Sequence, residues 1–130
     1  MNSPDIFSMF IDSIHRSNLD SLSGRHWIRY RSEYDYILSQ ICLANRKGSA
    51  LTMGALLEHS TLGSQPTVTK RVQELEKLQF IQSKTMDDAR VRSFTLTAIG
   101  EDYLKRCSQI ICDCFEECGA LSVTSLSRTP

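Results

Sequence analysis

Five cysteines are the most reactive side chains in the sequence, and four of them lie within residues 107–118, CSQIICDCFEEC. Thiolates bind zinc and take part in redox chemistry, so this segment could hold a metal or sense oxidation. Zinc sites use cysteine pairs a few residues apart, usually on turns, and no histidine is near. On a continuous helix Cys112 points away from Cys114, whereas Cys114 and Cys118 share a face. No metal site is therefore expected.

The simplest interpretation of these cysteines is that they fill the core, because free cysteine commonly behaves as a small buried hydrophobic residue. The same holds for Cys42. The alternative is a redox-sensing thiol, for which the candidates are Cys107, Cys114 and Cys118. A disulfide between two copies of the chain is also conceivable. An odd number of crowded cysteines does not resemble a disulfide framework, so a reducing cytoplasm is the expected location.

Small polar and basic side chains open the segment SQPTVTKRVQELEKLQFI, residues 64–81. Ser64 is the expected N-cap of a helix, and Pro66 fits the first turn, where its missing N–H does no harm. The unpaired N–H groups of a helix start favour an anion. The side chains that could contact phosphates and base edges are Ser64, Gln65, Thr67, Thr69, Lys70 and Arg71.

Two plausible strands follow, at 80–85 and 91–97, joined by the short charged turn MDDAR. This spacing predicts a β-hairpin. Lys84, Arg90 and Arg92 place positive charge on it, and an arginine at a hairpin tip suits a narrow, negative minor groove of DNA.

Hydrophobic periodicity predicts helices before and after this region. The expected helices are 4–22, 33–46, 53–60 capped by Thr52, the helix that Ser64 begins, and 98–118. The aromatic and basic segment 25–34 is expected to turn the chain. The Ser/Thr-rich tail 119–130 is expected to fray. The apolar stripe that should bury the helix after Ser64 consists of Val68, Val72, Leu75 and Leu78.

A short helix, a tight link, an amphipathic helix and a charged hairpin make a winged helix-turn-helix. Residues 33–106 resemble the DNA-binding core of the MarR-type transcriptional regulators, chiefly through TVTKRVQELEKLQFI and DDARVRSFTLTAIGEDYL. The first of these segments resembles the recognition helix running into a strand. The other segment resembles the wing, with its Asp-x-Arg and a closing Leu-Thr-x-x-Gly. The fold class expected is mainly α with a small β-hairpin.

The resemblance implies one domain over 1–130, with a DNA-binding core at 33–97 and dimerisation helices at 4–22 and 98–118. It implies a homodimeric regulator, in our interpretation a repressor, that binds a pseudo-palindromic site on double-stranded DNA. Asp88 would help to hold Arg90 in the wing.

The sequence departs from the common family pattern at three places. Ala89 stands where many members have another arginine, and Met86 replaces a proline before the acidic pair. The link before Ser64 is about one residue short. Because of these departures, the depth to which the wing enters the minor groove does not follow from the resemblance.

A heptad-like seam in the last expected helix supports dimerisation. Its members recur at steps of three and four and are Leu104, Cys107, Ile111, Cys114 and Cys118. The seam is only about two heptads long, so it cannot hold two chains together alone. The first expected helix is also too apolar for a free surface, and packing both helices against a second copy would bury them.

Trp27, Tyr30, Tyr34 and Tyr36 form an aromatic group near the corner between the first two expected helices, and the first three are the candidates for a ligand pocket. In similar regulators a small-molecule effector often binds between the dimer helices and the DNA-binding part, and aromatic residues could line that pocket. The simpler interpretation, which we favour, is that they fill the corner.

Other functions find less support. Fifteen basic and fifteen acidic residues cancel, so any nucleic-acid surface must be local. There is no nucleophile–base pattern, glycine-rich phosphate loop or catalytic carboxylate pair, so neither enzyme activity nor a cofactor is expected. No apolar run of about 18 residues and no secretory signal is present, so no membrane association is expected. The main alternative is a winged-helix adaptor that binds protein rather than DNA.

Overall fold

The computed structural model describes residues 5–16, 24–59, 63–85 and 91–127. The chain forms two compact units: a central unit of residues 23–104, and a terminal unit of residues 1–22 together with 105–130. In chain order the elements are α1 (Asp5–Arg16), α2 (Gly24–Arg46), β1 (Leu51–Thr52), α3 (Met53–His59), α4 (Gln65–Lys77), β2 (Ile81–Thr85), β3 (Arg92–Leu96) and α5 (Ala98–Ser127). The predicted class, mainly helical with a small hairpin, is confirmed.

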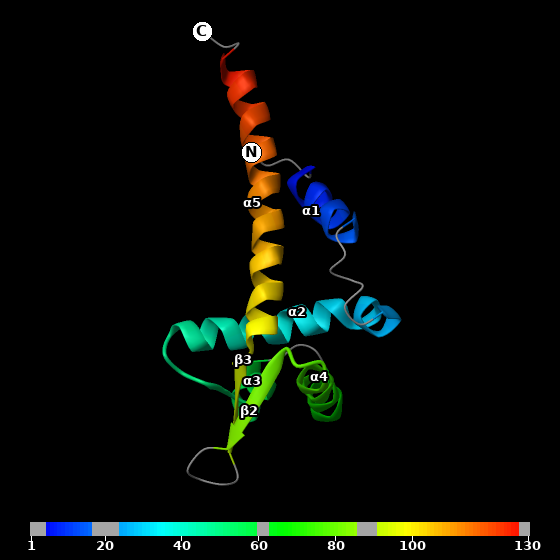
Figure 1. The fold of residues 1–130 in the computed structure, drawn as a ribbon, viewed down its shortest axis with the longest axis vertical. Helices are drawn as coiled ribbons and strands as arrows, with labels where there is room; N and C mark the ends of the chain where they lie inside the picture. Colours follow the sequence, from blue (N-terminus) through cyan, green and yellow to red (C-terminus); the bar gives the residue numbers. More distant parts are fainter. Residues whose placement is uncertain (1–4, 17–23, 60–62, 86–90, 128–130) are drawn as a thin grey trace. The chain divides into compact units, whose positions relative to one another are not determined.

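A three-stranded antiparallel sheet in the order β1-β3-β2 lies in the central unit, with α4 beside the β2–β3 hairpin (Figure 1). In the hairpin Ile81 pairs with Leu96 and Thr85 with Arg92. Both strands confirm the prediction from β-branched and aromatic residues on either side of a charged turn. Strand β1 was not predicted, because two residues are too few to show a period.

Helix α2 begins at Gly24, so the segment 25–34 is helical and does not turn the chain as predicted. The backbone kinks at Tyr30, where φ is −114° and ψ is 19°. The reason is packing: Trp27, Tyr34 and Ile41 bury one continuous side of the helix against the central unit. This tertiary gain outweighs the modest helix propensity of the aromatic residues.

An aromatic cluster forms the middle of this core. Trp27 stacks on Tyr34 with ring centroids 4.6 Å apart, and it meets the edge of Tyr103 at 5.2 Å. Phe80, in the turn between α4 and β2, lies 4.9 Å from Trp27. The hydroxyl of Tyr103 donates to Asp35 Oδ1 at 2.6 Å and so joins the first turns of α5 to α2. Trp27 and Tyr34 are fully buried, which is the packing role that we favoured over a ligand pocket.

Helices α3 and α4 are the helix pair that the spacing predicted. Thr52 caps α3, its Oγ1 accepting from the N–H of Ala55 at 3.1 Å. Ser64 stands at the N-cap of α4 in an extended conformation, and Pro66 lies in the first turn. The buried side of α4 includes Val68, Val72 and Leu75. The last member of the predicted stripe, Leu78, is the C-cap and is only half-buried.

The turn from α4 into β2 is tight and supports the start of α5. Gln79 has a positive φ of 67°, a conformation usually taken by glycine. Thr97 caps α5, its Oγ1 accepting from the N–H of Gly100 at 3.1 Å. A Cβ on Gly100 would lie 2.2 Å from the Phe80 carbonyl oxygen. The Leu-Thr-x-x-Gly pattern is therefore a cap followed by a close helix–turn contact.

In the terminal unit α1 packs antiparallel to the later part of α5 (Figure 1). Ser13 Oγ lies 3.9 Å from Cys114 Sγ, and Cys118 Sγ lies 3.4 Å from Met9 Sδ. Residues 17–22 of the predicted first helix are outside the described residues. Helix α5 continues to Ser127, beyond the predicted helix end at residue 118. None of the described helices has the length and apolarity needed to cross a bilayer.

Candidate nucleic-acid interface

The first turn of α4 presents polar groups to solvent. Ser64, Gln65 and Lys70 are exposed, whereas Thr67 and Thr69 are half-buried. Ser64 Oγ lies 3.2 Å from Thr67 Oγ1 and makes no hydrogen bond to the helix backbone. The Ser64 side chain therefore does not cap the backbone N–H groups at the start of α4. Together with the positive end of the helix dipole, these N–H groups favour an anion.

Arg71 is the exception, and here the structure corrects the sequence-based prediction of a phosphate contact. The residue is 5% exposed. Its guanidinium lies 3.4 Å from the centre of the Tyr30 ring and forms an ion pair with Glu74, one turn along α4. Arg71 Nε is 2.7 Å from Glu33 Oε2, so the two side chains form an ion pair. Within the described part of the chain, the angles at these two atoms do not allow a hydrogen bond.

Tyr34 completes this cluster, because its hydroxyl donates to Glu74 Oε1 at 3.0 Å. Burial, followed by the hydrogen bond and charge of Glu74, raises the pKa of Tyr34 to about 12. Burial works to lower the pKa of Arg71, but Glu74, with Tyr34 and Glu33, outweighs that effect and raises it. Both groups therefore keep their protons at physiological pH.

The helical period contained a signal for the buried Arg71 that the sequence interpretation missed. Positions 68, 71, 72 and 75 follow the i, i+3, i+4, i+7 pattern of one helix face. Because the other three positions are apolar and buried, the pattern places position 71 on the inner side of α4. The i, i+3 spacing to Glu74 also allowed an ion pair. Nothing local to α4 indicated the partners Glu33 and Tyr34 on α2.

On the wing, Lys84 is exposed on β2, and Arg92 lies on β3. The Arg92 side chain is 47% exposed and forms an ion pair with Glu76 Oε1 at 2.8 Å. Arg92 Nη2 also donates to Ser83 Oγ at 2.9 Å. These contacts tie the hairpin to the last turns of α4. Two further predicted wing residues, Asp88 and Arg90, lie outside the described residues.

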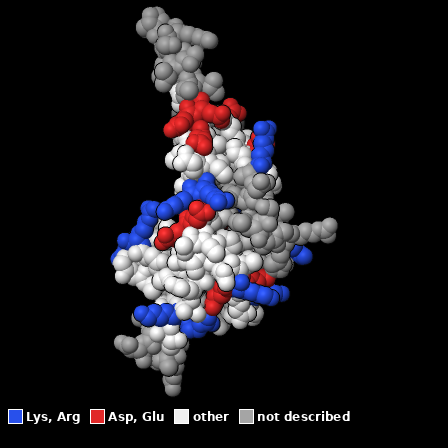
Figure 2. Space-filling model, viewed as in Figure 1, with Lys and Arg blue, Asp and Glu red and all other residues white. Residues whose placement is uncertain are grey.

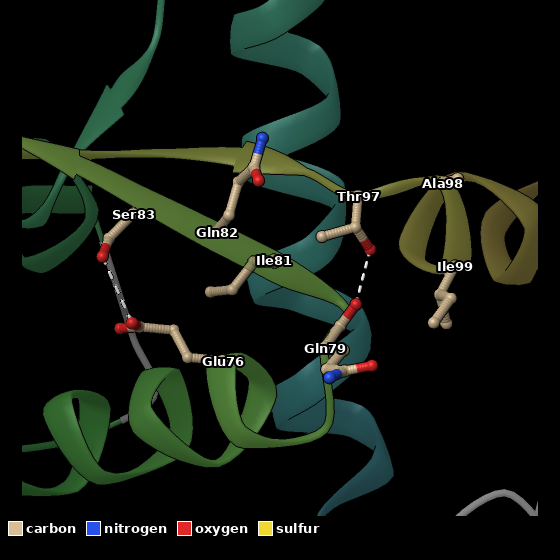
Figure 3. Close-up of a pocket in the computed structure, with 8 residues that line it drawn as sticks. All are labelled: Glu76, Gln79, Ile81, Gln82, Ser83, Thr97, Ala98 and Ile99. Carbon is tan, nitrogen blue, oxygen red and sulfur yellow. Dashed lines mark hydrogen bonds between the residues drawn. The ribbon is translucent and has the colours of Figure 1, made fainter.

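A shallow hollow of about 520 Å³ lies at the base of the hairpin, between the end of α4 and the start of α5 (Figure 3). Glu76 and Ser83 meet on one side of it through a 3.2 Å hydrogen bond. On the other side Thr97 Oγ1 donates to the carbonyl oxygen of Gln79. Its remaining lining residues are Ile81, Gln82, Ala98 and Ile99. The hydrogen bonds hold the turn together and leave no set of free polar groups that converges in the hollow.

Basic side chains lie beside the wing, and further basic and acidic side chains are spread over the rest of the visible face (Figure 2). Figure 2 shows Lys and Arg side chains next to the grey atoms of the hairpin tip. The described basic residues near the predicted DNA surface are Lys70, Lys84 and Arg92. This local arrangement is what a chain of zero net charge requires to attract a polyanion.

Two of the five cysteines, Cys114 and Cys118, are core residues, whereas Cys112 is exposed on α5. Cys114 and Cys118 are buried between α5 and α1 of the same chain, and Cys107 is half-buried. The described residues contain no group of three or more His, Cys, Asp or Glu side chains that could hold a metal ion. Cys42 is half-buried on α2.

No protein-family model and no curated protein matches the chain in sequence. Three structures of MepR from S. aureus match it in fold. The MepR–DNA complex is 18% identical, covers 96% of this chain and 98% of MepR, and has a TM-score of 0.63. A MepR mutant from a multidrug-resistant clinical isolate is 16% identical, with coverage of 96% and 84% and a TM-score of 0.54.

MepR bound to ethidium bromide is also 16% identical, with coverage of 95% of this chain and 82% of that one, and a TM-score of 0.52. At these identities the likeness concerns the fold. MepR belongs to the MarR family. The match in fold to the MepR–DNA complex extends over nearly the whole chain. The protein therefore has the winged helix-turn-helix fold of the MarR-type regulators, as the sequence predicted.

Proposed function

We propose that this protein is a transcriptional regulator that binds double-stranded DNA in a sequence-specific manner. The observation that carries the proposal is the exposed polar first turn of α4 beside a basic hairpin, on a fold shared with a protein solved in complex with DNA. A recognition helix reads base edges through its N-terminal residues in the major groove. Small side chains there can approach the bases without collision.

The residues divide by role. In this proposal Gln65 and Thr67 read base edges, since both belong to the first turn of α4. Ser64, Lys70 and Lys84 are placed to contact phosphates. Arg92 supports the hairpin through Glu76 and keeps part of its guanidinium exposed.

A homodimer would cover the apolar surface of the terminal unit. Four large apolar side chains stay exposed there: Phe7 (69%), Ile11 (38%), Ile111 (39%) and Phe115 (56%). Phe7 and Ile111 line one hollow of about 330 Å³. A two-fold dimer would set two recognition helices roughly 34 Å apart, one turn of DNA. The site would then be pseudo-palindromic, and bound protein would repress by occluding it.

A small-molecule effector is part of the proposal, since MepR has been solved with ethidium bound. Trp27 and Tyr34 are too deeply buried to meet an effector without a change of structure. Tyr30 is half-buried and is the more accessible of the three predicted aromatic residues.

Selection from a random duplex pool at physiological salt tests the proposal. The expected result is an enriched pseudo-palindrome with half-sites about one helical turn apart. Binding to it should weaken linearly on a logarithmic salt scale, with a slope near −0.9 per phosphate contact. A pool that stays random, with no duplex affinity above background, would instead favour the protein-binding adaptor.

A further inference from the structure

The buried ion pairs of Arg71 connect the recognition helix to α2. Arg71 and Glu74 belong to α4, whereas Tyr30, Glu33 and Tyr34 belong to α2. Three contacts join the two helices: Arg71 with Glu33, Arg71 with Tyr30, and Glu74 with Tyr34. A fourth contact, the ion pair of Arg71 with Glu74, lies within α4 and holds both side chains toward α2. We call these five residues the Arg71 cluster.

An arginine in this position needs an explanation other than stability. A buried guanidinium keeps its charge, and desolvating it offsets much of what its ion pairs return. An apolar residue on the same stripe as Val68 and Val72 would pack without that cost. The cluster instead fixes the orientation of α4 relative to α2, because a planar guanidinium between two carboxylates and an aromatic ring has few allowed orientations.

The cluster lies next to the predicted contact surface. Arg71 follows the exposed Lys70 directly and is one turn beyond Thr67. A rotation of α4 about its axis would turn Gln65, Thr67 and Lys70 relative to the duplex. The same rotation would pull Arg71 away from Glu33 and from Tyr30, which sits at the kink of α2.

We infer that the Arg71 cluster is a positioning device that fixes the rotation of α4 and thereby the side chains that it presents to DNA. The inference rests on the proposed function, which it deepens. Arg71 contributes to DNA affinity from inside the protein, through the orientation of α4, and it contacts no phosphate. Glu33 and Glu74 contribute in the same way although they carry negative charge.

Two substitutions that neutralise a glutamate test the inference, through whether DNA affinity rises or falls. If charge alone mattered, Glu33→Gln and Glu74→Gln would tighten DNA binding, since each removes a negative charge near a polyanion. A positioning role predicts the opposite, a loss of about fivefold or more, comparable with other site-to-site couplings. Glu58→Gln is the matched control, because Glu58 is exposed on α3 in the same unit and should not weaken binding.

The salt dependence of Arg71→Met separates positioning from direct contact. A lost phosphate contact would reduce the slope of log K against log salt by about 0.9. A positioning residue lowers affinity at every salt concentration and leaves the slope unchanged, because the long flexible side chain of Lys70 can still reach its phosphate after a small rotation of α4. Unchanged or tighter binding by both glutamine variants, or a slope reduced by about one in Arg71→Met, would overturn the inference.

Amide hydrogen exchange on the free protein tests the cluster without DNA. Glu33→Gln should raise exchange in α4 by about tenfold relative to exchange in the β2–β3 hairpin, while Glu58→Gln should leave both unchanged. Unaltered exchange of α4 would contradict the positioning role whatever the protein binds. If exchange rises as expected but the parent protein shows no affinity for any duplex, the proposed function fails and the structural role of the cluster stands.

Discussion

The hydroxyl of Tyr34 on α2 donates a hydrogen bond to Oε1 of Glu74 on α4 over 3.0 Å. The same carboxylate pairs with Arg71, so one acceptor joins a phenol and a guanidinium from two helices. Since Tyr34 is fully buried, its neutral form is strongly favoured in the folded state. This contact predicts how stability depends on pH in alkaline solution.

Stability should fall between pH 10 and pH 12 because of Tyr34. The pKa of Tyr34 is about 12 in the folded protein against 10.0 for the unperturbed side chain. In this window the unfolded chain releases the proton and the folded chain keeps it, so unfolding becomes easier as pH rises. The stabilisation is complete below pH 10, and about 2–3 kcal/mol is lost across the window.

Urea unfolding of the parent and of Tyr34→Phe at several pH values checks this. The variant is expected to be less stable at pH 8, and the difference between the two proteins should shrink steadily above pH 10. The comparison removes the contribution of lysines and of the other tyrosines, which titrate in both proteins. Curves that stay parallel up to pH 12 would show that Tyr34 ionises normally.

Gly100→Ala should destabilise the central unit by about 1–3 kcal/mol, the usual cost of forcing an extra atom into a packed site. The new Cβ would lie 2.2 Å from the carbonyl oxygen of Phe80, a backbone atom that cannot move aside cheaply. Gly54→Ala is the control, since its Cβ would meet only Thr52 Oγ1 at 4.0 Å. Denaturant midpoints followed by Trp27 fluorescence should separate the two variants, and equal midpoints would exclude the predicted collision.

Gln79→Gly should stabilise the protein by up to about 1 kcal/mol. Gln79 holds a φ of 67°, in the left-handed region that disfavours residues with a Cβ. The gain is limited because glycine also loosens the unfolded chain. Gln82→Gly, at an exposed position of β2 with ordinary backbone, should instead destabilise by about 0.5–1 kcal/mol. Thermal unfolding midpoints of the two variants and the parent protein measure this difference in sign. A lower midpoint for both variants would refute the prediction.

Elements with a strong local period could be predicted from the sequence. The β2–β3 hairpin and the apolar side of α4 followed from the alternation and spacing of Val, Ile, Phe and Leu. Thr52 and Ser64 could be placed because caps depend on a few adjacent residues. The winged helix arrangement followed from the order of these elements.

What could not be predicted depends on contacts between distant segments. Residues 25–32 form a helix because Trp27 packs against Tyr103 and Phe80, which lie far along the chain. Arg71 resembled a surface charge, since Lys70 and Gln73 around it are exposed. Its burial depends on Glu33 of α2. The contacts of Cys114 and Cys118 with α1 of the same chain could not be predicted either, because Ser13 and Met9 lie far from them in sequence.

Lys70→Ala and Lys84→Ala should each reduce the salt dependence of DNA binding. If each ammonium neutralises one phosphate, the slope of log K against log salt becomes less steep by about 0.9 per substitution. Sequence preference should not change, since phosphate contacts carry no sequence information. Lys77→Ala is the control, because Lys77 is exposed in the last turn of α4, away from the first-turn residues. Fluorescence anisotropy titrations over a range of salt concentrations measure the slopes. If Lys77→Ala changed the slope as much as the other two substitutions, Lys70 and Lys84 would not define the contact surface.

Phe115→Glu should dissociate the proposed homodimer. Phe115 is 56% exposed on α5, and burying a phenylalanine side chain is worth about 1.5–3 kcal/mol. A two-fold interface contains the residue twice, so the loss doubles to about 3–6 kcal/mol and raises the dimer dissociation constant by roughly 10² to 10⁴. Asp113→Ala is the control, because Asp113 is exposed two residues away and thus on nearly the opposite side of the helix. Sedimentation equilibrium of the three proteins gives the constants. Since Phe115 does not belong to the central unit, the variant should keep its fold there, and a dimer as stable as the parent's would place the interface elsewhere.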